Sequence, residues 1–178
     1  MRKHVALISS SLPPGGTTPV TGGGLRTQQL LSTLECTGHS VTLLVEAEAF
    51  PTRSRNPLKK NSFTRGELPK KLASLRPDLV VVEQWALLNA LGDYKGPTVV
   101  DLHGSLLLEN SFRRNHGALD QDAGAKLKAL RRADLMLTPA QSQIDYFTSW
   151  AILAGFDPRD PPLRLLLLAK ARVPFEKA

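Results

Sequence analysis

Short apolar runs alternate with segments of helical periodicity along most of the chain. Five such runs, each bounded by turn residues, predict buried β-strands at residues 5–9, 40–46, 78–83, 97–102 and 134–138. The runs are nearly all apolar, so the strands that they predict are covered on both faces. Strands of this kind are typical of a parallel sheet.

The segments between these runs predict the helices. Leu30, Leu31 and Leu34 fall on one helical face, and Gly38 suits the left-handed residue that ends a helix. The predicted helices cover residues 25–37, 66–75, 84–91, 105–114, 120–132 and 141–154. The tail after Pro161 stays open, because residues 163–169 fit a strand or a helix.

Strand–helix alternation predicts a Rossmann-like α/β fold, a doubly wound parallel sheet with right-handed crossovers. A chain of 178 residues suits one domain with a substantial core, so we expect one domain over residues 1–178. Ligands of such sheets bind at the carboxyl ends of the strands, beside the point where the strand order reverses. The loops that follow Ser9, Glu46, Glu83, Leu102 and Thr138 are therefore the candidate positions for a site.

Composition removes several classes of protein. The single cysteine, Cys36, excludes an internal disulfide and argues against a Cys/His zinc site, so no metal is expected. No run approaches the ~18 consecutive apolar residues of a membrane-spanning helix. Residues 5–8 are too short for the apolar core of a signal peptide. We therefore expect a cytoplasmic protein.

The net charge of +7 is unevenly distributed. One short stretch contains seven cations and a single acid, Glu67. The cations are Arg53, Arg55, Lys59, Lys60, Arg65, Lys70 and Lys71. This stretch is either a solvated loop and helix face or a patch for an anionic acceptor or membrane surface. The second alternative would place the protein peripherally on the inner face of a membrane. Nucleic acid is not an expected partner, since only Phe63 interleaves the cations.

Three consecutive glycines, Gly22, Gly23 and Gly24, open the first predicted helix. Glycine lets the backbone approach a ligand closely, and a helix N-terminus offers unpaired N–H groups to a phosphate or carboxylate. The spacing is neither the dinucleotide fingerprint G-x-G-x-x-G nor a P-loop. The alternatives are therefore contact with a sugar or anion, or a flexible turn.

The order of several motifs resembles the N-terminal part of family 4 glycosyltransferases. Gly22-Gly-Gly-Leu-Arg-Thr27, a helix and then Gly38-His-Ser-Val41 are similar to the family's opening. Pro77-Asp-Leu-Val-Val-Val82, Val99-Val-Asp-Leu-His103 and Ala133-Asp-Leu-Met-Leu-Thr138 resemble its next strands. Each motif is weak alone, but their order covers almost the whole chain.

This resemblance implies the acceptor-side half of a GT-B fold, in which two Rossmann-like domains enclose the active site. The family transfers a sugar from a nucleotide-sugar co-substrate, with retention and without a resident cofactor. Its second domain usually binds the donor and carries a pair of glutamates. No second series of strands and helices follows here, and Val173-Pro-Phe175 resembles the start of the family's linker. We therefore expect a domain that needs a C-terminal donor-binding partner, fused or in trans, and is inactive alone.

The resemblance and the predicted strand ends also suggest site residues. His103 would contact the transferred sugar as the catalytic residue, residues 22–24 and Arg26 would contact the donor phosphates, and Glu83 and Gln84 would meet the acceptor. Structural alternatives remain for each: a histidine bonded to a loop carbonyl, an arginine covering a helix, and ordinary caps. The rival function is a non-catalytic Rossmann-like binding module. A flavodoxin-like receiver is less consistent, because it needs an acidic cluster after the first strand.

Overall fold

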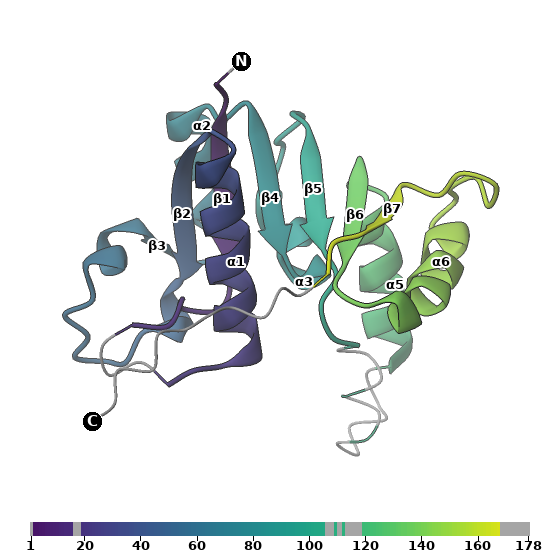
Figure 1. Ribbon diagram of the computed structural model, residues 1–178, viewed down its shortest axis with the longest axis horizontal. Helices are drawn as coiled ribbons and strands as arrows, with labels where there is room; N and C mark the ends of the chain where they lie inside the picture. Colours follow the sequence, from purple (N-terminus) through teal and green to yellow (C-terminus); the bar gives the residue numbers. More distant parts are fainter. Residues whose placement is uncertain (1, 16–18, 106–108, 110–111, 113–118, 168–178) are drawn as a thin grey trace.

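A computed structural model describes residues 2–15, 19–105, 109, 112 and 119–167. Seven parallel strands form one sheet with helices on both of its faces (Figure 1). The strands are β1 (His4–Ser9), β2 (Ser40–Glu46), β3 (Ser62–Phe63), β4 (Leu79–Glu83), β5 (Thr98–Asp101), β6 (Leu135–Thr138) and β7 (Leu163–Leu165). Their order is β3-β2-β1-β4-β5-β6-β7, so the direction of sheet growth reverses at β1. The predicted Rossmann-like parallel sheet is confirmed.

The helices differ in how they cover the sheet. They are α1 (Gly22–Cys36), α2 (Leu68–Leu75), α3 (Trp85–Leu88), α5 (Leu119–Leu130) and α6 (Ile144–Leu153). Short 3-10 turns occupy Ala47–Ala49, Pro57–Asn61, Asn89–Leu91 and Gln141–Gln143. The α1 helix contributes its leucines to one core cluster, whereas α2, α3, α5 and α6 contribute to the other.

Alternate residues of β1 enter the two clusters. Val5 and Leu7 pack on the α1 side, and Ala6 and Ile8 pack on the opposite side, all with no exposed surface. This division follows from the two-residue period of a strand, which sends successive side chains to opposite faces. An apolar run without alternation therefore fits a strand buried on both faces, as the sequence predicted.

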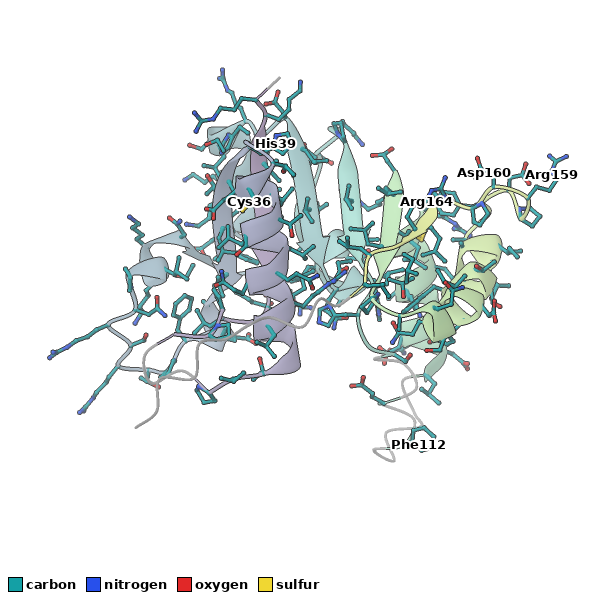
Figure 2. The ribbon with its side chains drawn as sticks, in the orientation of Figure 1. Cys36, His39, Phe112, Arg159, Asp160 and Arg164 are labelled. Carbon is teal, nitrogen blue, oxygen red and sulfur yellow. The ribbon has the colours of Figure 1, made fainter. Side chains whose placement is uncertain are left out.

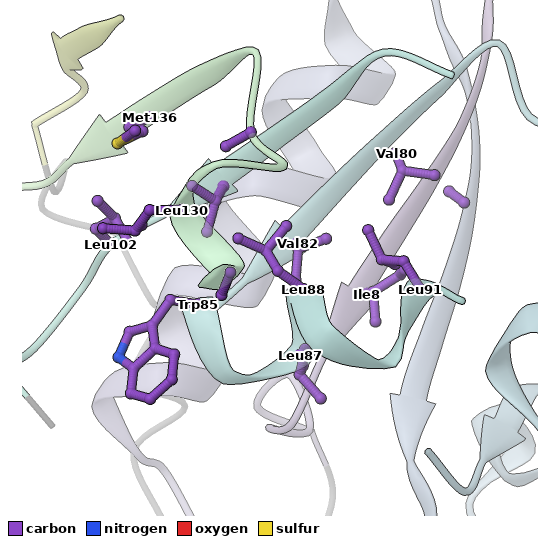
Figure 3. Close-up of a cluster of buried hydrophobic side chains, with 14 of the residues drawn as sticks. Ile8, Val80, Val82, Trp85, Leu87, Leu88, Leu91, Leu102, Leu130 and Met136 are labelled. Atoms are coloured by element: carbon purple, nitrogen blue, oxygen red, sulfur yellow. The ribbon is translucent and has the colours of Figure 1, made fainter. Parts of the chain in front are cut away.

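The larger cluster lies between the sheet and α3 (Figure 3). Val80 and Val82 of β4 and Leu88 of α3 are completely buried there, and Trp85 is 7% exposed. Burying a side chain of this size contributes about 1.5–3 kcal/mol relative to leaving it in water. The short α3 helix is therefore held by its apolar side chains, and it fixes the chain directly after the end of β4.

All five predicted strands are present, with ends that differ by one residue at most. Two further strands border the sheet: β3, which the sequence did not predict, and β7, which resolves residues 163–165 of the tail as a strand. Most of the predicted helix 105–114 lies outside the described residues. Residues 84–91 form α3 followed by a 3-10 turn, rather than one continuous helix.

The first helix begins three residues earlier than predicted. Gly22, Gly23 and Gly24 form its first turn and not a loop in front of it. Thr21 is the N-cap, and its hydroxyl accepts a hydrogen bond from the Gly24 N–H at 3.0 Å. Glycine is a poor helix former, which argued for a loop, but the cap and close packing outweigh that preference.

Candidate functional site

A polar network lies at the carboxyl ends of β1, β4 and β5, where the first turn of α1 meets them. It is centred on Glu83 at the end of β4 and includes the predicted residues Arg26, Gln84 and His103. The Cβ position of Gly23 lies 3.4 Å from Glu83 Oε1, and Glu83 Oε1 lies 3.3 Å from His103 Nε2. The glycines and His103 therefore share one edge of the sheet, as predicted. This edge is the switch point at which ligands of such sheets bind.

Two of the three glycines are needed for packing. A Cβ atom on Gly23 would collide with the side chain of Ser11, and one on Gly24 would collide with the carbonyl oxygen of Leu12. Gly22 has open space at the same position. The loop after β1 thus lies directly against α1, and Gly22 alone faces a free approach. The N–H groups of Gly22 and Gly23 precede the helix's own hydrogen bonds, and they have no partner in the part of the chain that the structure describes, so they can bind a ligand.

Arg26 is completely buried and is bound to Asp101. Its Nε donates to Oδ2 at 2.9 Å, its Nη2 donates to Oδ1 at 2.5 Å, and its Nη1 donates to Gln29 Oε1 at 2.8 Å. The alternative in which Arg26 covers the outer surface of the helix is therefore wrong. A phosphate contact by Arg26 stays a prediction, and it requires part of the guanidinium to turn away from these partners.

Asp101 connects this arginine to His103. Its Oδ2 lies 3.3 Å from His103 Nδ1. Burial opposes ionisation of Asp101, but the hydrogen bonds from Arg26 and His103 and the charge of Arg26 outweigh it and hold its pKa below the usual value. Asp101 was not among the site residues predicted from the sequence. The signal was its position two residues before His103, which places both side chains on the same face at the end of β5.

Glu83 is an acid at the centre of the site with no exposed surface. The hydroxyls of Ser9 and Thr27 donate to its Oε2, while its Oε1 has no hydrogen-bond partner among the described residues. Burial is the largest influence on Glu83 and raises its pKa. The two hydroxyls oppose this, as would a charge on His103, and Asp101 adds to it. Contact between Glu83 and an acceptor stays a prediction. Ser9 and Thr27, which the sequence did not indicate, hold the carboxyl in place.

Gln84 has an unusual backbone and a specific side-chain contact. Its φ of 84° lies in the left-handed region that non-glycine residues rarely occupy. The side-chain Nε2 donates to the carbonyl oxygen of His103 at 2.9 Å and lies 3.1 Å from His103 Nε2. Although Gln84 is the N-cap residue of α3, its side chain makes no capping bond. Strained backbone of this kind persists where the surrounding structure fixes it, and it is common at functional sites.

His103 therefore has both ring nitrogens in contact with protein groups, and its side chain is 18% exposed. A sugar hydroxyl reaches Nε2 only by replacing the Gln84 amide. The other histidine considered from the sequence, His39, lies with Cys36 at the opposite end of α1 (Figure 2). The structure thus connects Gly23, Arg26, Glu83, Gln84 and His103 in one network, with Gly22 and Gly24 beside it in the same helical turn.

Two hollows lie beside the loop that follows β1. One of about 270 Å³ is lined by Ser10, Ser11, Leu12, Pro19, Thr21 and Ala49. A larger groove of about 770 Å³ is bordered by the loop after β1 and by the basic stretch, including Arg53 and Arg55. Arg65 of the same stretch is paired with Glu46 at 2.7 Å. The basic stretch is therefore not uniform, because Arg53 and Arg55 face a groove while Arg65 supports the fold.

The described residues provide no features of two other kinds of site. No helix within the described ranges is long and apolar enough to cross a bilayer. In the same part of the chain, no group of three or more His, Cys, Asp or Glu side chains is arranged to hold a metal ion.

Comparison with known proteins identifies the fold. No family model matches the chain, and no curated protein matches it by sequence. Among solved structures, sucrose-phosphate synthase from Thermosynechococcus elongatus superposes with a TM-score of 0.63 and 14% identity, covering 93% of this chain and 48% of that chain. This chain therefore spans about half the length of that structure. The neighbour is a glycosyltransferase of the GT-B fold, and the likeness supports a fold of the kind found in one half of such an enzyme.

Proposed function

We propose that this chain is the acceptor-side domain of a retaining glycosyltransferase of the family 4 type, which moves a sugar from a nucleotide-sugar to an acceptor. The observation that carries the proposal is the polar network at the switch point of the sheet. Glu83, His103 and the first turn of α1 meet there, at the edge where such sheets bind ligands. The fold likeness to one half of a GT-B enzyme supports the same assignment.

The free groups at this edge suit different parts of a donor. The N–H groups of Gly22 and Gly23 can bind a phosphate oxygen at the positive end of α1. His103 can exchange its hydrogen bond with Gln84 for one with a sugar hydroxyl. Electrostatic stabilisation of the leaving diphosphate would be the main catalytic contribution, and no metal is expected. Glu83 and Gln84 would influence the acceptor side through the position of His103.

Catalysis would need a second wall. Transfer requires donor and acceptor in a near-attack arrangement, which contributes about 7–11 kcal/mol of barrier lowering. One Rossmann-like unit presents only one side of that arrangement. We therefore propose that a C-terminal donor-binding domain, fused or in trans, is the functional partner. We place this activity in the cytoplasm, with Arg53 and Arg55 turned toward an anionic acceptor or the inner membrane face.

A transfer assay with labelled nucleotide-sugar tests this function. The 178-residue chain alone should bind donor weakly and transfer nothing, and a complementary donor-binding domain should restore transfer. In the restored enzyme, His103→Ala should lower kcat by about 10²-fold or more, within the range for groups that act on a reacting centre. His39→Ala is the matched control, because His39 lies at the far end of α1. Transfer by the isolated chain would contradict the division into two walls.

A second candidate is a non-catalytic binding module. The observation that favours it is the commitment of both His103 nitrogens and the Arg26 guanidinium to partners inside the protein. Under this alternative, the complementary domain would restore no transfer, yet nucleotide or sugar would still bind at the glycine turn. Calorimetry on the isolated chain separates the two functions.

A further inference from the structure

One buried oxygen in the network lacks a hydrogen-bond donor. Glu83 Oε1 is buried and unpartnered among the described residues, although Oε2 of the same carboxyl accepts from two hydroxyls. Among the described residues, the ring nitrogen near it is His103 Nε2, at 3.3 Å. A buried acceptor without a donor costs about 1–3 kcal/mol, and more when it is charged. A proton between these two atoms would remove that cost.

The proton can belong to either partner. If it is on Nε2, an imidazolium donates to a Glu83 carboxylate. If it is on Oε1, a carboxylic acid donates to the lone pair of a neutral imidazole. Both arrangements carry the same total charge, so the surrounding hydrogen bonds must distinguish them.

The Gln84 amide makes the distinction. Its NH₂ group donates to the carbonyl oxygen of His103 at 2.9 Å, which fixes the orientation, since a flipped amide would bring two carbonyl oxygens together. The same NH₂ group lies 3.1 Å from His103 Nε2 and is a donor there. An N–H on Nε2 would oppose this donor, whereas a lone pair accepts from it. The second arrangement is therefore the consistent one.

The other ring nitrogen fits this assignment. His103 Nδ1 lies 3.3 Å from Asp101 Oδ2, and Asp101 is the partner of the Arg26 cation. A neutral imidazole with its proton on Nδ1 donates to that carboxylate. The four side chains of the network then carry no net charge, because Arg26 is positive, Asp101 is negative, and Glu83 and His103 are neutral. Beyond Gly104, the exposed Glu109 places a further carboxylate near this edge.

We infer that Glu83 is a neutral carboxylic acid whose Oε1–H donates to Nε2 of a neutral, Nδ1-protonated His103, where it shares the single lone pair with the Gln84 amide. Glu83 is thus a positioning residue, which acts on a ligand through His103. Building on the proposed function, a ligand group that replaces the Gln84 amide at Nε2 must itself be a donor, so it is an uncharged hydroxyl of a sugar and not a phosphate oxygen. The phosphates would then be left to the N–H groups of Gly22 and Gly23.

Two spectroscopic measurements on the full chain test the inference without requiring transfer activity. Infrared spectra at pH 7 should contain the carbonyl stretch of a protonated carboxylic acid, which Glu83→Gln removes. Glu35→Gln, at an exposed position of α1, should keep it. Imidazole ¹⁵N shifts should show His103, assigned with His103→Gln, as a neutral ring protonated on Nδ1.

The variants separate positioning from mere support of the fold. Glu83→Gln keeps a donor facing Nε2 and should preserve the Nδ1 tautomer, whereas Glu83→Ala leaves the Gln84 amide as the donor there and should lower the share of that tautomer. An imidazolium signature for His103 in the wild-type protein at pH 7, or an infrared band that survives Glu83→Gln, would overturn the assignment. The wild-type spectra decide the point even if a variant does not fold. A failed transfer assay would leave these results unaffected, so the two proposals can fail separately.

Discussion

The guanidinium of Arg26 and the carboxylate of Asp101 form a doubly hydrogen-bonded ion pair with side-chain exposures of 1% and 0%. The pair joins the first turn of α1 to the end of β5, although β4 separates β5 from β1 in the sheet. It therefore fixes the helix N-terminus over the switch point. The glycine turn and His103 keep their relative positions through this contact.

Arg26→Met should destabilise the protein by about 3–5 kcal/mol, because it leaves the Asp101 carboxylate buried without its cation. The double variant Arg26→Met/Asp101→Leu should recover much of that loss, since neither charge is then buried alone. Urea unfolding measures both. Lys3→Met removes a cation from the exposed Lys3–Asp78 pair and should have little effect. An equally small loss for Arg26→Met would show that the buried pair does not hold α1.

Alanine substitutions at the glycine turn should have opposite effects on stability. Gly22→Ala meets open space and should stabilise the protein by about 0.4–1 kcal/mol, because alanine restricts the unfolded chain. Gly24→Ala should destabilise it, since the new Cβ collides with the rigid backbone at Leu12. Thermal unfolding compares the two variants. Equal effects would mean that the loop after β1 is not packed against α1.

The stability of the protein should depend on the protonation of Glu83. Because burial raises its pKa from 4.5, the folded state keeps a proton that the unfolded state loses as pH rises. The stabilisation is complete below pH 4.5 and is lost as pH increases through the folded-state pKa. Relative to Glu83→Gln, the wild-type protein should therefore become less stable with rising pH. Urea unfolding between pH 4 and 8 tests this, and Glu35→Gln should run parallel to the wild type.

Lys126 of α5 should produce the opposite pH dependence. It is 1% exposed, and its Nζ lies 4.0 Å from the ring centroid of Trp150 and 3.2 Å from the Tyr146 hydroxyl. Burial lowers its pKa to about 7 from 10.5, while the ring faces favour the ammonium. Between the folded-state pKa of about 7 and the unfolded-state value of 10.5, Lys126 is protonated in the unfolded protein but not in the folded one. The free energy of unfolding should therefore rise with pH across that interval. Lys126→Met should abolish the rise, and Lys128→Met, exposed on the same helix, should retain it. A wild-type profile identical to that of Lys126→Met would exclude a shifted lysine.

Arg53 and Arg55 provide a test of the anionic-surface proposal. Both are exposed beside the groove, without an ion-pair partner among the described residues. Replacing both with Gln should weaken co-sedimentation with anionic vesicles by about tenfold at low salt, since each cation near such a surface contributes to binding. Removing two cations elsewhere, Lys95 and Lys128, should have a smaller effect. Binding that is equal for neutral vesicles, or insensitive to salt, would contradict an electrostatic patch.

The strands could be predicted from the sequence because their patterns are local. Val80, Val81 and Val82 specify a strand covered on both faces, and neighbouring turn residues define its ends. The start of α1 was not predictable in the same way. It depends on the Thr21 cap and on the contact between Gly24 and Leu12. Neither contact contributes to the apolar periodicity from which the helix was predicted.

The candidate site was predictable as a location but not as a network. Strand-end positions correctly brought Glu83, Gln84 and His103 to one edge. The pairing of Arg26 with Asp101 spans 75 positions and has no local signal. The left-handed backbone of Gln84 likewise arises from tertiary contacts, since nothing about glutamine favours it.

The central place of β1 has a consequence for how the chain folds. Its residues pair with β2 on one side and with β4 on the other, and both partners follow it in the chain. The strand therefore completes its hydrogen bonds only after residue 82 is synthesised. Parallel pairing between strands so far apart in the sequence is slow, because the entropy of loop closure is lost before the new contacts stabilise the chain. During synthesis, Val5, Leu7 and Ile8 therefore stay exposed until partner strands emerge. Low temperature or a chaperone should therefore favour soluble expression. Substitutions that weaken β4 should lower the soluble yield even where the free energy of unfolding changes little.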